Sequence, residues 1–462
     1  MKKHPSTWIY RYIYTIVILG VLLSCQMVTG QEREAEVTTV PESPSLTKTL
    51  PASATETLTA ETKMVPQQAG VALRPFPQHV QYPADTIKPN HVLQDQLDEE
   101  VAEFYQTWKE SYLKSGDEEG CGPDRYYVRF SPEGPVISVS EGHGYGMLLT
   151  VLMAGHDPEA RKYFDGLYYF FKDHPSQKSP NLMAWRQMEG CITEADDLGT
   201  ATDGDMDIAY ALLLADAQWG SGDAINYRQE AIYVIQAIMQ NEINPEVWSI
   251  LLGDWADPTQ PIYYFSTRTS DFMPNHLRAY QAASGDDRWK LALEKGYGLV
   301  SILQTTYSPN TGLLPDFIQD TNLSPRPADP GFLESPHDGR YFYNACRDPW
   351  HIGVDYLLSG DLRAKQAIEP INTWLIDHLG GNPALIRAGY ALDGSDIEDN
   401  DYTSLAFVAP LGVAAMMDGS HQDWLNNIWD LVVNKEMEGY YEDTLKLLSM
   451  LVMSGNWWAP AE

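Results

Sequence analysis

The sequence predicts an all-α protein, a toroid in which twelve helices pair into six hairpins around a common axis. Two observations carry this prediction. From about residue 89 onward, apolar residues recur at helical spacing in segment after segment. Tight turn signals, mostly Gly-Asp, divide these segments into pairs, as between antiparallel helices. Five hairpins are marked in this way, so the first and last helices remain to pair with each other.

The helices are expected in chain order, each from its own apolar pattern and punctuation. The first covers residues 94–114, because Leu97, Val101 and Trp108 recur at helical spacing. Gly155 then ends the second helix, and Pro158 suits the first turn of the third, which ends near residue 172. The other helices are expected at residues 141–154, 204–219, 224–240, 272–283, 287–303, 349–358, 362–379, 404–417, 421–433 and 441–453.

Long connections join one hairpin to the next, at about residues 115–139, 174–202, 242–270, 306–346 and 380–401. Loops of this length in a compact domain usually carry function. Because all hairpin turns lie at one end of the toroid, the long connections are expected to gather at the other end. They would form a cleft whose aromatic faces suit pyranose rings, unless these aromatics are core. The expected lining is Trp185, Trp255, Tyr263, Tyr264 and Tyr343.

Residues 140–147 place one carboxylate among three glycines, a histidine and a tyrosine, directly before an apolar run. Glu141 is therefore expected at the mouth of a buried helix. A carboxyl surrounded by apolar groups tends to stay protonated and can act as a general acid. The alternative is that Glu141 caps the helix start and interacts with its dipole.

Three aspartates alternate in residues 201–207, before another apolar helix. The pattern is similar to the start of a calcium loop, which requires Gly at its sixth position and Glu at its twelfth. Those positions hold Ile208 and Leu214, so no metal site is expected. Asp203 either caps the helix or lies on the cleft floor and accepts hydrogen bonds from sugar hydroxyls.

The N-terminal region differs in composition from the rest. Residues 1–24 have a basic start and a short apolar run, as in a signal peptide. The sequence Leu-Leu-Ser-Cys around Cys25 is similar to a bacterial lipoprotein cleavage site, although an ordinary secretory signal is the alternative. Residues 25–72 lack aromatics and predict a flexible tether before a catalytic domain at 73–462. We expect an extracytoplasmic protein, attached to a membrane only through an N-terminal lipid.

Charge and cysteine content narrow the partners. Residues 1–72 hold equal numbers of basic and acidic side chains, so the whole net charge of −33 falls on residues 73–462. Such acidity argues against nucleic acid and suits a neutral or cationic ligand, or simply solubility. Besides Cys25, the three cysteines Cys121, Cys191 and Cys346 cannot all pair and show no metal spacing, so no disulfide framework or zinc site is expected. Nothing indicates a cofactor or an obligate oligomer, and a monomer is expected.

Several segments resemble the signatures of glycoside hydrolase family 8, over about residues 88–459. The resemblance implies an (α/α)6 barrel of six helical hairpins, which agrees with the helix count. It also implies inverting hydrolysis of a β-1,4-linked glucan, mixed-linkage β-glucan, xylan or chitosan, and it is closest to bacterial endoglucanases and chitosanases. The matching segments are residues 140–147, 163–168, 201–209, 307–313, 343–350 and 454–458.

The resemblance assigns roles to individual residues. Glu141 matches the general acid, and Asp203 matches the aspartate that holds the distorted sugar. Arg347 would hold nearby anions or hydroxyls. Sugar contacts are implied for Trp185, Trp255 and Tyr343, and more weakly for Tyr441.

The catalytic base is the point of departure from the family pattern. Many members have Asp at the position of Asn344, and an amide cannot take a proton from water at neutral pH. In the subfamily with Asn there, a glutamate from an upstream loop takes this role, and Glu334 is the candidate here. Rival carboxyls are Asp329, Asp338 and Asp348. Inversion would leave about 6.5–9.5 Å between the two catalytic carboxyls for a water molecule.

Two classes of function follow from this reading. The first is an inverting endo-hydrolase, with glucan as the preferred substrate and chitosan as the alternative. The second is a lipid-anchored glycan-binding protein that kept the barrel and lost turnover. Asn344 motivates the second hypothesis, as does His351, where the family pattern leads us to expect Arg.

Overall fold

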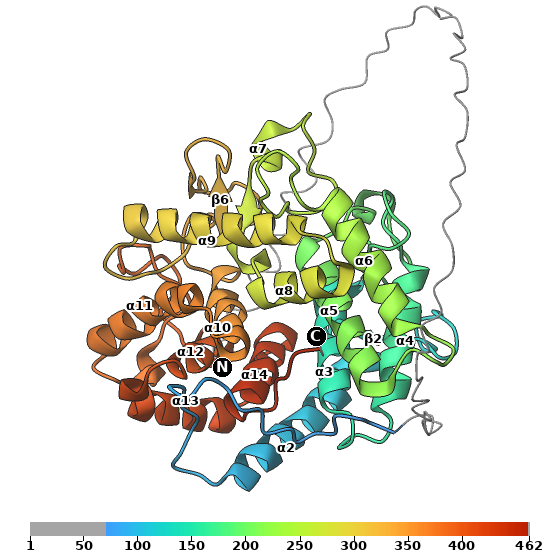
Figure 1. Cartoon of the computed structure of the whole chain (residues 1–462), viewed down its shortest axis with the longest axis horizontal. Coiled ribbons are helices and arrows are strands. Elements are labelled where there is room, and N and C mark those ends of the chain that lie inside the picture. The colour runs from blue at the N-terminus through green and yellow to red at the C-terminus, as the bar shows by residue number, and fades with distance from the viewer. Residues whose placement is uncertain (1–70, 461–462) are drawn as a thin grey trace, which may run out of the picture. The chain divides into compact units, whose positions relative to one another are not determined.

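Twelve long helices and one short helix run through residues 71–460, the part of the chain described by this computed structural model (Figure 1). The predicted signal peptide, Cys25 and the tether up to residue 70 lie outside the described residues. No helix within residues 71–460 has the length and apolarity to cross a bilayer. The helices are α2 (Gln94–Tyr112), α3 (Ser140–Leu152), α4 (Ala160–Asp173), α5 (Thr202–Trp219), α6 (Tyr227–Asn241), α7 (Pro261–Tyr264), α8 (Pro274–Ser284), α9 (Arg288–Tyr307), α10 (Asp348–Ser359), α11 (Leu362–Leu379), α12 (Leu405–Ala415), α13 (Gln422–Asn434) and α14 (Tyr440–Met453).

Six of these helices form a closed inner ring. Helices α3, α5, α8, α10, α12 and α14 each contact the next, and α14 contacts α3. Helices α4, α6, α9, α11 and α13 each pack on the inner helix that precedes them, and α2 packs on α14. The predicted pairing of the first and last helices is therefore confirmed, and the fold is the expected all-α barrel of six hairpins.

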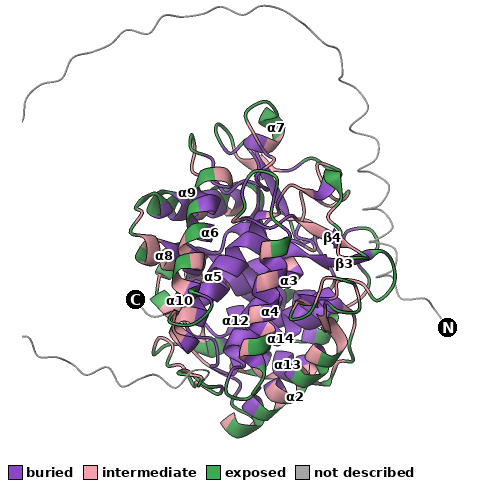
Figure 2. Ribbon diagram, turned by 90° about the vertical axis from the view of Figure 1, so that its right-hand side faces the viewer, coloured by how far each residue is buried: buried purple, intermediate pink, exposed green. Residues whose placement is uncertain are grey.

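Burial separates the two layers (Figure 2). Every residue of α12 and of α14 is buried, as expected for helices surrounded by other helices. The outer helix α4 instead buries one face, with residues such as Phe164, Leu167 and Phe171. The core thus lies in and around the inner ring.

All six inner helices begin at the same end of the barrel. Short turns follow their C-terminal ends, for example at Gly285 and Gly360, whose φ angles of 71° and 73° favour residues without a Cβ. The long connections therefore return the chain to the N-terminal ends of the inner helices. Exposed N–H groups give such ends a partial positive charge that favours anionic side chains.

Short strands occupy parts of these connections, which the sequence analysis had treated as loops. Antiparallel pairing joins β1 to β2, β3 to β4, and β5 through β6 to β7. Strands of two to four residues are too short for a period-two pattern to be recognised. Their bounds are β1 (Leu113–Ser115), β2 (Tyr126–Val128), β3 (Val136–Val139), β4 (Arg186–Met188), β5 (Thr267–Arg268), β6 (Phe317–Gln319) and β7 (Arg326–Pro327). Single 3-10 turns are η1 (Ala195–Asp197), η2 (Thr269–Asp271), η3 (Ala345–Arg347), η4 (Pro383–Leu385) and η5 (Gly419–His421).

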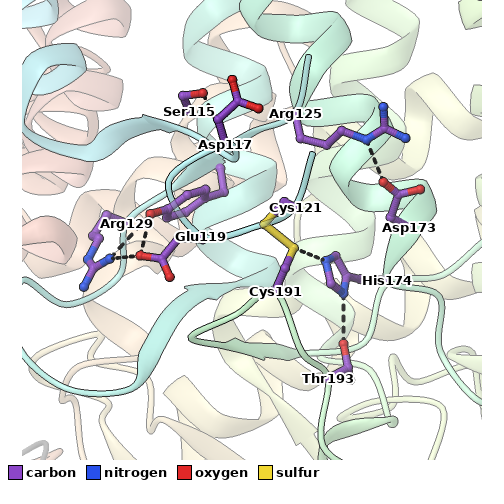
Figure 3. Close-up of a disulfide and its surroundings, with 11 residues drawn as sticks. Ser115, Asp117, Glu119, Cys121, Arg125, Arg129, Asp173, His174, Cys191 and Thr193 are labelled. Atoms are coloured by element: carbon purple, nitrogen blue, oxygen red, sulfur yellow. Dashed lines mark hydrogen bonds and ion pairs between the residues drawn. A yellow bond between two sulfur atoms is a disulfide. The ribbon is translucent and has the colours of Figure 1, made fainter. Parts of the chain in front are cut away.

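A disulfide joins Cys121 to Cys191 across 70 residues (Figure 3). The bond ties the connection before β2 to the turn after β4. The expectation of no disulfide was wrong because an odd number of cysteines prevents complete pairing without preventing one bond. His174 lies against this bond, with Nε2 3.3 Å from the Cys191 sulfur. Cys346 is the free cysteine of the described residues and is buried.

Candidate active site

The first turns of α3 and α5 bring two carboxyls together. Glu141 lies in the first turn of α3 and Asp203 in the first turn of α5. A Cβ at Gly204 would stand 2.5 Å from the Ser140 carbonyl carbon, so the absence of a side chain there lets the two helix starts touch. Val139 and Ala201 occupy the N-cap positions, so neither carboxyl is an N-cap, although both lie in first turns, where the helix dipole favours an anionic side chain.

Arg347 lies between these carboxyls at the start of α10. Its guanidinium is 1% exposed. Nη1 donates to Glu141 Oε2 at 2.8 Å and to Asp203 Oδ2 at 2.9 Å. Nη2 donates to Ser270 Oγ at 2.8 Å and to Asn344 Oδ1 at 2.9 Å. Nη1 also donates to the Tyr145 hydroxyl at 3.1 Å, so one buried cation is shared by two carboxyls and three neutral side chains.

Glu334 reaches the same region from the connection before α10. Its Oε1 accepts a hydrogen bond from Arg268 Nη2 at 2.7 Å, and its Oε2 accepts one from Asn344 Nδ2 at 2.8 Å. The Glu334 side chain is 37% exposed, so its carboxylate is accessible to solvent. Arg268, on β5, is buried and also lies 3.9 Å from Asp203 Oδ2.

These contacts join six side chains, which we call the carboxylate–guanidinium ring: five close on one another, and Glu141 is attached to them through Arg347. The closed part runs from Arg347 through Asn344, Glu334, Arg268 and Asp203 back to Arg347, and Glu141 joins it at Arg347. The ring holds three carboxyls and two guanidiniums. The two cations can balance two of the three carboxyls, which leaves one carboxyl better accommodated in its neutral form.

The pKa values of the two helix-bound carboxyls move apart. Burial raises the pKa of Glu141 to about 7, although the nearby Arg347 opposes the rise. Burial also acts on Asp203, but Arg268 and Arg347 together outweigh it and hold the pKa of Asp203 below its ordinary value. Burial raises the pKa of the neighbouring Asp271 to about 7 as well. Below pH 7, Glu141 is therefore a protonated carboxyl beside an ionised aspartate, the arrangement of a proton donor.

The three rivals of Glu334 have other environments. Asp338 is buried and accepts three backbone N–H groups of residues 333–335, at 2.7, 3.1 and 2.8 Å, so it shapes the loop that carries Glu334. Asp348 is fully buried, and burial raises its pKa well above the ordinary value, which leaves it neutral. Asp329 forms a surface ion pair. Of these four carboxyls, Glu334 contacts the members of the ring.

Two aspartates of the alternating segment point elsewhere. Asp205 Oδ1 accepts the backbone N–H of Met183 at 2.7 Å, and Asp207 Oδ1 lies 2.9 Å from His276 Nε2. Among residues 71–460, no three His, Cys, Asp or Glu side chains are arranged to hold a metal ion. The separate partners of Asp205 and Asp207 explain why alternating aspartates here do not converge on one point.

The predicted aromatic residues divide into two groups. Trp185, Trp255, Tyr263 and Tyr343 are half-buried. Tyr264 is buried, at 5% exposure, and packs edge-on against Phe265, so its expected place in the cleft was wrong.

The position of Tyr441 also differs from the one that its weakly expected role in sugar stacking requires. It is buried, and its hydroxyl donates to the Tyr343 carbonyl at 2.5 Å. Its neighbour Tyr440, which the sequence analysis did not select, donates to Glu141 Oε1 at 3.2 Å. A Cβ at Gly142 would lie 2.5 Å from the Tyr440 hydroxyl, so the glycine makes room for this contact. The triple-glycine segment was the available signal for such a close approach.

Two further residues support the site without having been predicted. Arg268 orients Glu334, as described above. Asp316 is buried, and its Oδ1 accepts backbone N–H groups of Asn344 at 3.1 Å and Ala345 at 2.8 Å. Asp316 therefore fixes the backbone of the segment that carries Asn344 and Arg347.

His351, where the family pattern led us to expect Arg, reaches the site indirectly. Burial lowers the pKa of His351 well below the ordinary value, so its imidazole is neutral. Its Nδ1–H donates to the Ser270 carbonyl at 2.7 Å, and the hydroxyl of Ser270 accepts from Arg347. The histidine thus supports the arginine through a serine rather than contacting a carboxyl.

Known proteins match most of this chain. A family model described as glycosyl hydrolases family 8 matches residues 85–455. A β-glucanase of Niallia circulans is 48% identical over 385 residues, which cover 83% of this chain and 91% of that protein. An endoglucanase of Bacillus sp. strain KSM-330 is 40% identical over 394 residues, 84% of this chain and 82% of that protein.

Solved structures give the same result. The apo structure of a β-1,3-1,4-glucanase from Paenibacillus sp. X4 matches with a TM-score of 0.79 at 48% identity, over 84% of this chain and 99% of that chain. A xylanase from Teredinibacter turnerae, at 21% identity and a TM-score of 0.66, shares the fold over 80% of this chain and 95% of that chain.

Proposed function

We propose that this chain, which belongs to family 8 of the glycosyl hydrolases and is a glycoside hydrolase, cleaves internal β-1,4 linkages of a glucan with inversion of the anomeric centre. The observation that carries the proposal is the carboxylate–guanidinium ring. Two of its carboxyls, Glu141 and Glu334, reach it from different elements and keep exposed fractions of 19% and 37%. The names of the β-glucanase and endoglucanase relatives support glucan as the substrate.

In the proposed reaction, Glu141 gives its proton to the glycosidic oxygen as the bond from that oxygen to the anomeric carbon breaks. Asp203 stays ionised and accepts hydrogen bonds from hydroxyls of the sugar whose ring is distorted. A water molecule on the opposite face of the ring attacks the anomeric carbon and gives a proton to Glu334. The donor carboxyl has then lost a proton and the acceptor has gained one.

Asn344 is well suited to a reaction that uses Glu334 as the base. Its amide donates to Glu334 Oε2, and its carbonyl accepts from Arg347. A carboxylate in place of this amide would face Glu334 at hydrogen-bond distance, and the two like charges would repel each other. The amide therefore suits an ionised Glu334.

The arrangement also supports inversion rather than a covalent intermediate. Arg347 and Asn344 stand between Glu141 and Glu334 in the ring. Two intervening side chains suit an inverting enzyme, which needs space for a water molecule between its base and the sugar, whereas retaining enzymes bring the carboxyls to about 5–5.5 Å.

The test compares three polymers and follows the product anomer. We expect reducing-sugar release from lichenan and carboxymethyl-cellulose and none from chitosan, with the α-anomer appearing first by NMR. Reducing-sugar release from chitosan alone would show that the substrate is chitosan rather than glucan. No release from any polymer, or the β-anomer as first product, would overturn the proposal.

We also propose that the protein acts outside the cytoplasm as a monomer, with residues 25–72 as a tether to a lipid on Cys25. The disulfide supports an oxidising compartment. Incorporation of labelled palmitate into the wild type and not into Cys25→Ser tests the anchor, and equal labelling of both would refute it.

A further inference from the structure

A surface groove of about 770 Å³ lies on the outer layer of the barrel, away from the carboxylate–guanidinium ring. It runs along α11 and meets the connection that follows α9. Most of its polar lining residues are exposed, and a half-buried tryptophan lies among them. Residues that line it include Asn310, Gln366, Thr373, Trp374, Asp377 and His378.

Trp374 provides a fixed aromatic surface in this groove. Its edge packs on Tyr390 at 5.2 Å with the two rings perpendicular, so the indole cannot swing freely. A Cβ at Gly394 would come within 2.7 Å of the indole, and this glycine has a φ of +89°. The ring of His378 lies nearly parallel to the indole, at 5.2 Å and 22°. The imidazole is stacked on the indole, so the two rings line the groove as one aromatic stack on the helix.

The polar residues around this surface match the hydroxyls of a sugar. Gln366 and Asn310 offer amides, Thr373 a hydroxyl and Asp377 a carboxylate, all of them exposed. These groups donate to and accept from hydroxyls, whereas an aromatic face packs against the apolar face of a pyranose ring. The groove lining contains no Lys or Arg, so a polyanion is a poor ligand for it.

The groove is connected to the active site through the backbone. Tyr390, which holds Trp374, exchanges two hydrogen bonds with Tyr341, at 3.1 and 3.0 Å. Tyr341 stands three residues before Asn344 in the chain. The C-terminal end of α11 also lies at the barrel end where the inner helices begin, because α11 runs antiparallel to α10. A glucan chain bound in the groove would therefore lie at the catalytic end of the barrel.

We propose that this groove is a second binding site for the β-glucan chain, which retains polymeric substrate on the enzyme surface while another segment is cleaved. The inference rests on the proposed function, since it takes its ligand from that reaction. Its ligand is a neutral β-linked glucose polymer, held by stacking on Trp374 and by hydrogen bonds from the surrounding side chains.

The test measures binding in the full chain with Glu141→Gln, which removes turnover. Calorimetry with a β-glucan hexasaccharide is expected to give two sites per chain, and one site when Trp374→Ala is added. In native gels that contain lichenan, the added change should weaken retardation about tenfold, the effect of losing one stacked aromatic. The control is Tyr233→Ala on α6, an aromatic that is 43% exposed and outside the groove, and its retardation should be unchanged.

Further variants distinguish loss of binding in the groove from loss of folding and from loss of the proposed activity. The double change Gln366→Ala and His378→Ala alters exposed side chains, so it keeps the test valid if Trp374→Ala unfolds. One site per chain before the tryptophan is changed, or equal retardation of the groove variants and the control, would overturn the inference. Wild-type activity on the hexasaccharide reports the active site separately, so failure of the proposed function would be visible as absent hydrolysis.

Discussion

Replacing Glu334 by glutamine tests the proposed base with little change of shape. In the unchanged protein, the Glu334 carboxylate accepts from Arg268 at 2.7 Å and from the amide of Asn344 at 2.8 Å. In the variant, the glutamine carbonyl can still accept from Arg268, but the glutamine NH2 group would then face the NH2 group of Asn344. One hydrogen bond is lost as a result. Because Glu334 is 37% exposed, the ion pair contributes less than about 1 kcal/mol to stability.

The catalytic effect should be far larger than the effect on stability. Loss of a general base costs about 10²–10⁴-fold in kcat, which corresponds to about 2.7–5.5 kcal/mol of barrier. The Michaelis constant should change little, because the glutamine keeps the shape of the site. Initial rates on lichenan and thermal melting of both proteins measure the two effects.

The matched control is Asp329→Asn, which removes a carboxylate from the same connection but from a surface ion pair. We expect wild-type rates for this variant. Azide should partly restore the rate of Glu334→Gln by forming a glycosyl azide, because this anion needs no base before it attacks. A Glu334→Gln rate above about one tenth of wild type would refute the reasoning, since a general base contributes at least about a hundredfold.

Four other predictions follow, three from the geometry of the site and one from the disulfide. The rate should fall about tenfold per pH unit above pH 7, because Glu141 has a pKa of about 7 and must be protonated. Tyr440→Phe removes a hydrogen bond that favours ionised Glu141, so the falling limb should move to higher pH, and an unmoved limb would argue against this contact. Asn344→Asp should place a second carboxylate at hydrogen-bond distance from Glu334, so kcat on lichenan should fall, and an unchanged kcat would argue against this contact. Reduction of the disulfide, which closes a loop of 70 residues, should lower the free energy of unfolding by about 4 kcal/mol. Calorimetry with and without reductant measures this difference, and equal stability under both conditions would contradict the prediction.

The fold could be predicted from the sequence more completely than the site. Helix pairing could be predicted because apolar spacing and turn glycines are local signals, and these recur in every hairpin. The role of Arg268 could not, because it depends on a two-residue strand that brings this side chain to Glu334. Adjacent residues on a helix point about 100° apart, which sequence alone does not resolve, so Tyr441 was selected where Tyr440 makes the contact.

The carboxylate–guanidinium ring has a consequence for how a turnover ends. Below pH 7, with its donor protonated, the ring holds two positive and two negative charges and is electrically neutral toward an uncharged sugar. In the proposed reaction Glu141 releases one proton and Glu334 captures one, so the total stays constant while the substrate is cut. After product release, Glu334 is therefore protonated and Glu141 is ionised, the reverse of the state that begins a turnover. Before the next bond can break, Glu334 must give its proton to solvent and Glu141 must take one up, because the guanidinium of Arg347 stays protonated and cannot pass a proton between them.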